Sequence, residues 1–215
     1  MSSTIFLPER ELVPKPEDED PIDYYYKPFT GRLYRARLEL AARLLGRGHG
    51  DLIEVGYGSG IFLPELARRA ERIAGNDIHA ARLDVEAMLA GMSIKADLRD
   101  ASLYELPFEN GSFDALVCLS VLEHLRDLSG ALDEFRRVVR PGGVAVLGFP
   151  VRNAATDVFF RIAGYNPREI HPSSHADIYR AIESHPGWSI EQRGKVPPFL
   201  PLPLAAYGAC RARAA

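Results

Sequence analysis

Apolar residues follow two different periods along the chain, and the changes between them predict its elements. Short apolar runs typical of strands occupy residues 51–55, 72–77, 93–97, 114–121 and 144–150. Between these runs, apolar residues recur at helical spacing over residues 61–70, 81–91 and 131–140. Strands and helices that alternate in this way form a parallel sheet with helices on both faces. We therefore predict an α/β fold for residues 51–150.

The flanking segments have other patterns. Residues 1–32 contain an acidic cluster and several prolines, and we expect them to form an N-terminal arm or lid. A helical stripe begins at Leu33 and continues through Arg37, Leu40 and Leu44. After residue 150 we expect two helices, over 155–165 and 173–185. We also expect two antiparallel strands, over 188–196 and 205–214, which bring the sheet to seven strands.

Composition limits the possible functions. The chain has 215 residues, a formal charge of −3 and a pI of about 6.1, which argues against nucleic-acid binding as its main role. Its two cysteines, Cys118 and Cys210, form no CxxC motif, so we expect neither a disulfide framework nor a zinc site. We find no apolar run long enough for a membrane span and no signal-peptide order, so we expect a cytoplasmic protein.

Three glycines follow the first predicted strand at alternate positions, Gly56, Gly58 and Gly60. In a doubly wound sheet the first strand-to-helix turn lies at the ligand crevice, and glycines let a ligand approach the bare backbone. The dinucleotide fingerprint requires a further glycine where this chain has Ile61, and the loop lacks the GK[ST] ending of a P-loop. Dinucleotide binding and ATP hydrolysis are therefore disfavoured.

The segment "EVGYGSG" (54–60) resembles the first motif of the class I S-adenosylmethionine-dependent methyltransferases. The resemblance continues through "IAGNDI" (73–78), "LRDASLYELPFENGSFDALVCLSVLEHL" (98–125) and "EFRRVVRPGGVAVLGFP" (134–150). It covers about residues 51–150 in the order and spacing of that family. It implies a Rossmann-like doubly wound, mostly parallel seven-stranded sheet, with S-adenosyl-L-methionine as cofactor and S-adenosyl-L-homocysteine as product. A domain over 33–215 with a substrate-side insertion at about 151–186 follows.

The resemblance also implies cofactor contacts. Glu54 places an anion near the cationic end of the cofactor, and Asp77 accepts hydrogen bonds from the ribose hydroxyls. Ile78 covers a face of the adenine. The remaining expected contacts are those of Gly56, Tyr57, Gly58, Gly60, Asp100, Ala101 and Leu119.

Some of these roles carry alternatives. Asp100 and the Ala101 backbone are expected at the adenine edge, although Asp97 competes if the register differs by a few residues. The Leu119 carbonyl is expected at the methionine amine. Relatives often have cysteine or a small residue at Tyr57, so this side chain narrows the pocket or reaches the substrate.

Candidate catalytic residues are histidines near the crevice. His124 could accept a substrate proton, because the pKa of histidine lies near operating pH; the alternative is a helix-start residue bonded to local backbone. His175 is a second candidate and His171 a substrate-side one, the alternative for both being a solvated loop. Pro172 argues against a shared helix, and we expect no metal. Asp114 is expected to bind backbone N–H groups near its strand start.

Apolar side chains gather around the expected pocket. Tyr25 and Tyr26 are candidates for the substrate side, with packing onto the domain as the alternative. The apolar stretches 158–160 and 198–204 favour a small, partly apolar acceptor, although ordinary core or a dimer contact would also explain them.

The sequence thus predicts methyl transfer to oxygen or nitrogen of a small, partly apolar molecule, without nucleic acid or membrane span, by a monomer or homodimer. A non-catalytic S-adenosylmethionine-binding module and an NAD-dependent Rossmann oxidoreductase are the alternatives.

Overall fold

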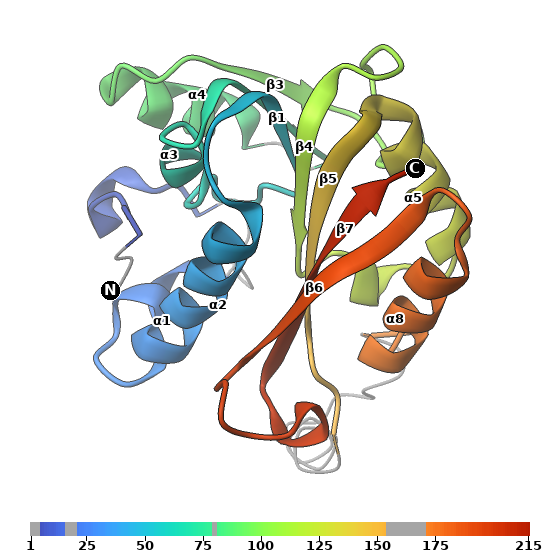
Figure 1. Ribbon diagram of the computed structural model, residues 1–215. Helices are drawn as coiled ribbons and strands as arrows, with labels where there is room; N and C mark the ends of the chain where they lie inside the picture. Colours follow the sequence, from blue (N-terminus) through green and yellow to red (C-terminus); the bar gives the residue numbers. More distant parts are fainter. Residues whose placement is uncertain (1–4, 16–20, 79–80, 154–170) are drawn as a thin grey trace.

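A computed structural model describes residues 5–15, 21–78, 81–153 and 171–215 of the chain (Figure 1). Its strands are β1 (His49–Val55), β2 (Ala70–Asp77), β3 (Ala96–Asp100), β4 (Phe113–Leu119), β5 (Val139–Pro150), β6 (Trp188–Val196) and β7 (Tyr207–Ala214). Its α-helices are α1 (Ile22–Tyr26), α2 (Thr30–Leu45), α3 (Leu63–Leu66), α4 (Arg82–Gly91), α5 (Leu128–Val138) and α8 (His175–Ser184), and its short 3₁₀ helices are η1 (Arg10–Leu12), η2 (Leu122–His124) and η3 (Leu202–Leu204).

The seven strands form one sheet in the order β3-β2-β1-β4-β5-β7-β6. Neighbours from β3 to β5 run parallel, whereas β7 is antiparallel to both β5 and β6. The predicted doubly wound, mostly parallel sheet is therefore confirmed, including its antiparallel C-terminal pair. The strand order reverses between β1 and β4, and in such sheets the ligand crevice lies at the carboxyl ends beside this reversal.

Helices cover both faces of the sheet, and each face has its own apolar core. Successive residues of β1 point to opposite faces, since Leu52 packs in one core and Ile53 in the other. The first core receives α2, α3 and α4, and the second receives α5 and α8. The two groups of helices flank the sheet in Figure 1, with α1 and α2 on one side and α5 and α8 on the other.

Several predicted element boundaries were wrong, and three of them have a clear local cause. The helix expected over 61–70 is α-helical only at Leu63–Leu66, because the chain turns and enters β2 at Ala70. The strand expected over 93–97 begins at Ala96, after Ser93 adopts a positive φ of 59° at the end of α4. The strand expected over 144–150 begins at Val139, and residues 141–143 form a bulge inside β5 rather than a break before it.

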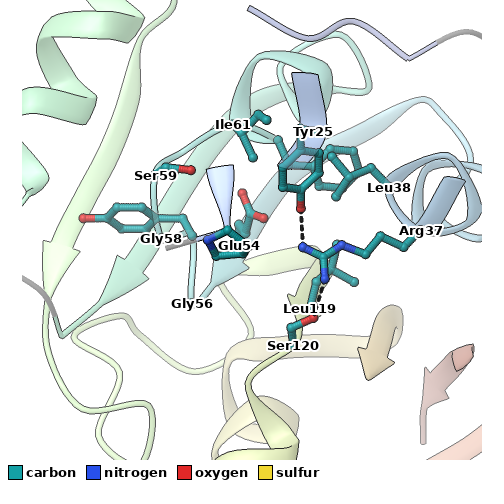
Figure 2. A pocket seen from close by; sticks show the side chains of 13 residues that line it. Tyr25, Arg37, Leu38, Glu54, Gly56, Gly58, Ser59, Ile61, Leu119 and Ser120 are labelled. Carbon is teal, nitrogen blue, oxygen red and sulfur yellow. Dashed lines mark hydrogen bonds between the residues drawn. The ribbon is translucent and has the colours of Figure 1, made fainter. Parts of the chain in front are cut away.

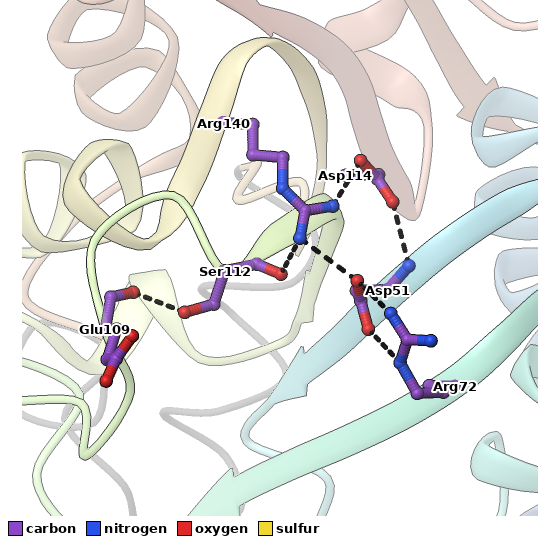
Figure 3. A network of polar contacts seen from close by, with 6 residues as sticks. All are labelled: Asp51, Arg72, Glu109, Ser112, Asp114 and Arg140. Carbon is purple, nitrogen blue, oxygen red and sulfur yellow. Dashed lines mark hydrogen bonds and ion pairs between the residues drawn. The ribbon is translucent and has the colours of Figure 1, made fainter.

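The amino ends of β1 and β4 are joined by a polar network (Figure 3). Asp114 accepts the backbone N–H of Asp51 at 2.8 Å, as its predicted structural role requires. Arg140 donates to Asp114 at 2.6 Å and to Asp51 at 3.1 Å. Arg72 pairs with Asp51 through two hydrogen bonds of 2.6 and 2.7 Å. These arginines lower the pKa of Asp51. Burial acts to raise the pKa of Asp114, but the hydrogen bond and charge of Arg140, together with hydrogen bonds from the backbone of Asp51 and Gly50, lower it overall.

Two predictions lie outside the described residues, namely the helix over 155–165 and the apolar stretch 158–160. Among the residues that the structure does describe, no helix combines the length and the apolar character needed to cross a membrane.

Candidate functional site

The loop between β1 and α3 turns sharply at its three glycines. Gly56, Gly58 and Gly60 have φ angles of 77°, 53° and 71°, in the left-handed region that favours glycine. A Cβ on Gly56 would lie 2.2 Å from Cγ2 of Val121, and a Cβ on Gly60 would lie 2.5 Å from Cγ1 of Val85. Glycine is therefore required here both by the backbone conformation and by the close approach of η2 and α4.

A cavity of about 180 Å³ opens beside this loop, at the carboxyl ends of β1 and β4 (Figure 2). Predicted cofactor contacts form part of its lining, namely Glu54, Gly56, Tyr57, Gly58 and Leu119. Pockets that enclose a whole drug-sized ligand measure roughly 300–1,000 Å³. The cavity therefore has room for one end of a molecule of cofactor size, and Gly60, although predicted as a contact, packs against α4 instead of lining it.

Glu54 is the buried acidic group of the cavity. Its side chain is 4% exposed, and no hydrogen-bond donor of the described residues reaches its Oε2. Burial first, and the negative charge of Asp77 second, raise the pKa of Glu54 well above its usual value. Because a buried carboxylate oxygen without a donor is costly, a cation bound next to it would be stabilised strongly.

Arg37 of α2 supplies the opposite charge to the same cavity, and sequence reasoning missed it. Its guanidinium donates to the hydroxyl of Tyr25 and, at 3.5 Å, to Oγ of Ser120 (Figure 2). The rings of Tyr25, Tyr34 and Tyr207 surround it, with centroids 5.2, 4.5 and 5.7 Å from Cζ. Among the described residues no carboxylate forms an ion pair with Arg37. The available signal was an arginine on an otherwise apolar helical stripe.

Asp77 and Ile78 lie outside the cavity, at the end of β2. The carboxylate of Asp77 accepts the backbone N–H of Gly58 at 2.8 Å and that of Ile78 at 2.7 Å. The side chain of Ile78 is 81% exposed. Asp77 therefore holds the glycine loop to β2, and Ile78 offers an uncovered apolar surface next to it.

Asp100 stands beside Asp77 in the sheet, at the end of β3, whereas Asp97 lies within the strand opposite Ala74. Asp100 accepts a hydrogen bond from Arg82 at 2.8 Å. The N–H of Ala101 donates to the carbonyl of Asp77 at 3.1 Å, so the backbone group expected at the adenine edge already has a partner. Asp100 rather than Asp97 therefore lies at the strand end beside Asp77.

Tyr57 is 4% exposed and packs across β2. A Cβ on Gly75 would lie 2.8 Å from its Cδ1, so the ring depends on the glycine beneath it. Burial is the main cause that raises the pKa of Tyr57 above its usual value. The side chain therefore belongs to the apolar core, and the residue also forms part of the cavity lining.

The two tyrosines predicted on the substrate side, Tyr25 and Tyr26, differ in whether they line the cavity. Tyr25 of α1 lines the cavity and contacts Arg37. Tyr26 points its hydroxyl to the carbonyl of Pro8 at 2.8 Å, which ties the N-terminal segment to α1. The alternative of packing onto the protein therefore describes Tyr26 better.

Two of the three predicted histidines meet beyond β4. His124 and His171 stack edge to face, with ring centroids 5.0 Å apart. Glu123 lies beside them, 3% exposed, and Nε2 of His124 is 4.0 Å from its Oε1. Burial raises the pKa of Glu123 to about 8, and burial followed by the nearby His124 lowers that of His171 to about 4.

His175, the other predicted catalytic residue, begins α8. Its Nδ1 is buried, with no hydrogen-bond partner among the described side chains and backbone. Burial lowers the pKa of His175. The sequence considered His171 and His175 as a pair, whereas the structure brings His171 to His124.

Comparison with known proteins agrees with this geometry. Residues 53–147 match the model of a family described as a methyltransferase domain. The chain is 32% identical over 126 residues to a ubiquinone biosynthesis O-methyltransferase of Alkalilimnicola ehrlichii, covering 57% of this chain and 51% of that protein. It is also 32% identical over 152 residues to a Mycolicibacterium smegmatis protein named "Probable S-adenosylmethionine-dependent methyltransferase", covering 71% and 56%. The chain thus spans about half the length of these curated relatives.

Solved structures share the fold at low sequence identity. A geranyl diphosphate C-methyltransferase from Streptomyces coelicolor, in complex with S-adenosyl-L-homocysteine, superposes with a TM-score of 0.70 at 17% identity, over 99% of this chain and 90% of that one. The N-methyltransferase NodS from Bradyrhizobium japonicum, also with S-adenosyl-L-homocysteine, gives 0.67 at 17% identity, over 93% and 94%. These neighbours are Rossmann-like, as the sheet order already indicated.

Proposed function

We propose that this chain, through a class I S-adenosylmethionine-dependent methyltransferase domain with S-adenosyl-L-methionine as cofactor, transfers a methyl group to an oxygen or nitrogen atom of a small, partly apolar molecule. One observation carries the proposal. A cavity beside the glycine loop holds the buried Glu54 and the guanidinium of Arg37; among the described residues, Oε2 of Glu54 has no hydrogen-bond donor and Arg37 has no acidic partner. These opposite charges complement the ammonium and carboxylate of an amino acid.

The residues present fit the cofactor in two parts. Glu54 and the carbonyl of Leu119 would hold the ammonium group, and Arg37 with Ser120 would hold the carboxylate. Outside the cavity, Asp77 would accept hydrogen bonds from the ribose hydroxyls, since carboxylate oxygens accept more than one hydrogen bond each. The exposed Ile78 would cover the adenine, with Asp100 at its edge.

The chemistry requires little from the protein beyond alignment. The sulfonium of the bound cofactor supplies a reactive methyl group with a good leaving group. The protein contributes by holding donor and acceptor in line and by excluding water, which is a large effect in itself. A base is needed only where the acceptor must lose a proton, and His124 and His175 are the candidates.

The acceptor class rests on two supports. Aromatic rings border the cavity at Tyr25, and Phe199 and Leu204 are 81% and 61% exposed in the C-terminal segment. Among the similar proteins, the ubiquinone biosynthesis O-methyltransferases methylate an oxygen atom, as their name states. We therefore favour an oxygen acceptor on a partly apolar molecule over nitrogen.

The N-terminal arm, expected over residues 1–32, would cover the cofactor. Pro21 and Tyr25 line the cavity. The backbone N–H of Phe6 donates to Glu65 at 2.8 Å, and Arg10 pairs with Asp23 at 2.7 Å. The proposal keeps the predicted domain over 33–215, a cytoplasmic location, and a monomer or homodimer without nucleic acid.

Calorimetric titration with S-adenosylmethionine, S-adenosylhomocysteine and NAD tests the proposal. We expect micromolar binding of the first two and none of NAD. Asp77→Ala should weaken both by at least about tenfold, because it removes a charged acceptor and loosens the loop at Gly58. Asp97→Ala is the matched control, since Asp97 is exposed and, among the described residues, its side chain pairs with Arg99 alone.

Transfer is then measured as S-adenosylhomocysteine formed with a panel of hydroxylated and aminated aromatic acceptors. Binding of NAD alone would indicate the oxidoreductase alternative. Cofactor binding without turnover of any acceptor in the panel would favour the non-catalytic module.

A further inference from the structure

We propose that Glu123, His124 and His171 form a binding site for a divalent transition-metal ion such as Zn²⁺. The three side chains come from two segments, η2 and the residues before α8. Each offers one ligand atom, and these atoms all lie within 4.8 Å of one another. Neither the family resemblance nor the pattern of histidines in the sequence indicated this set.

The geometry needs only a small contraction. Zinc binds imidazole nitrogen and carboxylate oxygen at about 2.0–2.2 Å, so tetrahedral ligand atoms stand roughly 3.4 Å apart. Nε2 of His124 and Oε1 of Glu123 are 4.0 Å apart in the protein. The side chain of His124 is 50% exposed and so has room to move toward an ion, while Glu123 remains fixed by its burial.

A second observation points to a missing cation. Oε2 of Glu123 is buried and receives no hydrogen bond from the described residues. The whole residue is 3% exposed, so the carboxylate is largely shielded from bulk water. A buried carboxylate oxygen without a donor is costly, and a metal ion at the histidines would satisfy it.

The backbone holds the two segments together. The N–H of Ser173 donates to the carbonyl of Glu123 at 3.2 Å, and Oγ of Ser173 donates to the carbonyl of Leu125 at 2.6 Å. Ser174 and Asp177 then form a capping box that starts α8. His171 is therefore placed beside His124 by contacts that do not depend on the histidines themselves.

The donor set selects the class of ion. Two imidazoles and one carboxylate suit Zn²⁺ and neighbouring divalent transition metals, whereas Mg²⁺ and Ca²⁺ prefer oxygen ligands. Three protein ligands leave at least one position open, as in catalytic rather than structural zinc sites.

The η2 segment of the site begins two residues after Ser120, which lines the cavity. An acceptor hydroxyl bound to the ion would lose its proton more easily. This consequence rests on the proposed function, whereas the metal site itself does not.

The test is titration of the chelator-treated full chain with Zn²⁺ alone, by calorimetry with a competing chelator, in the absence of cofactor. We expect one ion per chain at micromolar affinity or tighter. His124→Ala and His171→Ala should each weaken binding by at least about 30-fold. His175→Ala, the matched control, should change it by less than threefold. With Co²⁺ as probe, visible absorption should appear in the wild type and be lost in His171→Ala.

Absence of stoichiometric binding to the wild type would overturn the proposal, and so would retention of full affinity in both ligand variants. A loss in His175→Ala equal to that in His171→Ala would assign the ion to the other histidine pair and also overturn it. Circular dichroism and S-adenosylmethionine titration of each variant check folding. Because the S-adenosylmethionine titration measures cofactor binding independently of zinc binding, failure of the metal site and failure of the proposed function are distinguishable.

Discussion

Charged side chains at the two ends of the central strands differ in whether they have partners of opposite charge. At the amino ends, Asp51 and Asp114 are each matched by arginine, and their pKa values are lowered (Figure 3). At the carboxyl ends, Glu54 is buried without a donor on Oε2, its pKa is raised, and Arg37 has no carboxylate partner among the described residues (Figure 2). The first arrangement matches its charges within the protein, whereas the second leaves charges that the ligand of the proposed function would match.

Of the variants that test this contrast, Arg37→Met should have the largest effect on ligand affinity. It removes the charge expected to bind the cofactor carboxylate, and a hydrogen-bonded charge contributes about 1.5–3 kcal/mol. We expect calorimetric affinity for S-adenosylhomocysteine to fall by roughly 10- to 100-fold. Arg43→Met on the same helix is the control, because Arg43 is exposed.

A second ligand sharpens this result. 5′-Methylthioadenosine lacks the amino acid end, so Arg37→Met should leave its affinity unchanged. Equal losses for both ligands would mean that Arg37 supports the cavity through its three tyrosine rings rather than through the carboxylate.

How far the sequence anticipates the site depends on the distance between its parts along the chain. The glycine loop, Glu54 and Asp77 are local to β1 and β2, so their spacing alone places them at the strand ends. Arg37 reaches Ser120 across 83 positions, a contact created by the packing of α2.

The same reason explains the histidines. Spacing drew attention to His171 and His175, which are neighbours in the sequence, but the bonds of Ser173 bring His171 to His124 instead. The boundary of β5 was missed because a bulge lets Pro141 and both following glycines stay within a strand. No local pattern distinguishes such a bulge from a break.

Glu54 should make ligand affinity depend on pH, and we expect this effect to be of intermediate size. Its raised pKa means that the free protein binds a proton there at a pH where an ordinary glutamate is ionised. A cationic ligand requires the carboxylate, so binding releases that proton. Affinity should therefore rise with pH below the pKa of Glu54 in the free protein, by up to tenfold per unit.

Calorimetry in buffers of different ionisation enthalpy measures the released proton directly. Glu54→Gln should weaken binding, abolish the proton release and flatten the pH profile. Because a raised carboxyl pKa makes the fold less stable as pH rises, Glu54→Gln should also stabilise the ligand-free protein near neutrality. A proton release unchanged in Glu54→Gln would assign it to another group.

The smallest effect is expected at the opposite end of the sheet. Arg140→Met removes the bridge between Asp51 and Asp114, yet Arg140 is 40% exposed, and exposed ion pairs contribute little. Thermal unfolding at pH 7 should shift down by about 2 °C, with less shift in high salt. The lowered carboxyl pKa values stabilise the fold above the unfolded value, about 3.9, and this stabilisation is lost as pH falls through the folded values.

The difference between Arg140→Met and the wild type should therefore fade in acid, while affinity for S-adenosylhomocysteine stays unchanged at pH 7. A loss of affinity comparable to that of Arg37→Met would remove the contrast between the two ends, because it would show that the matched charges also support the ligand site. Unchanged affinity with a small, salt-sensitive loss of stability would instead separate the charges that maintain the sheet from those that await a ligand.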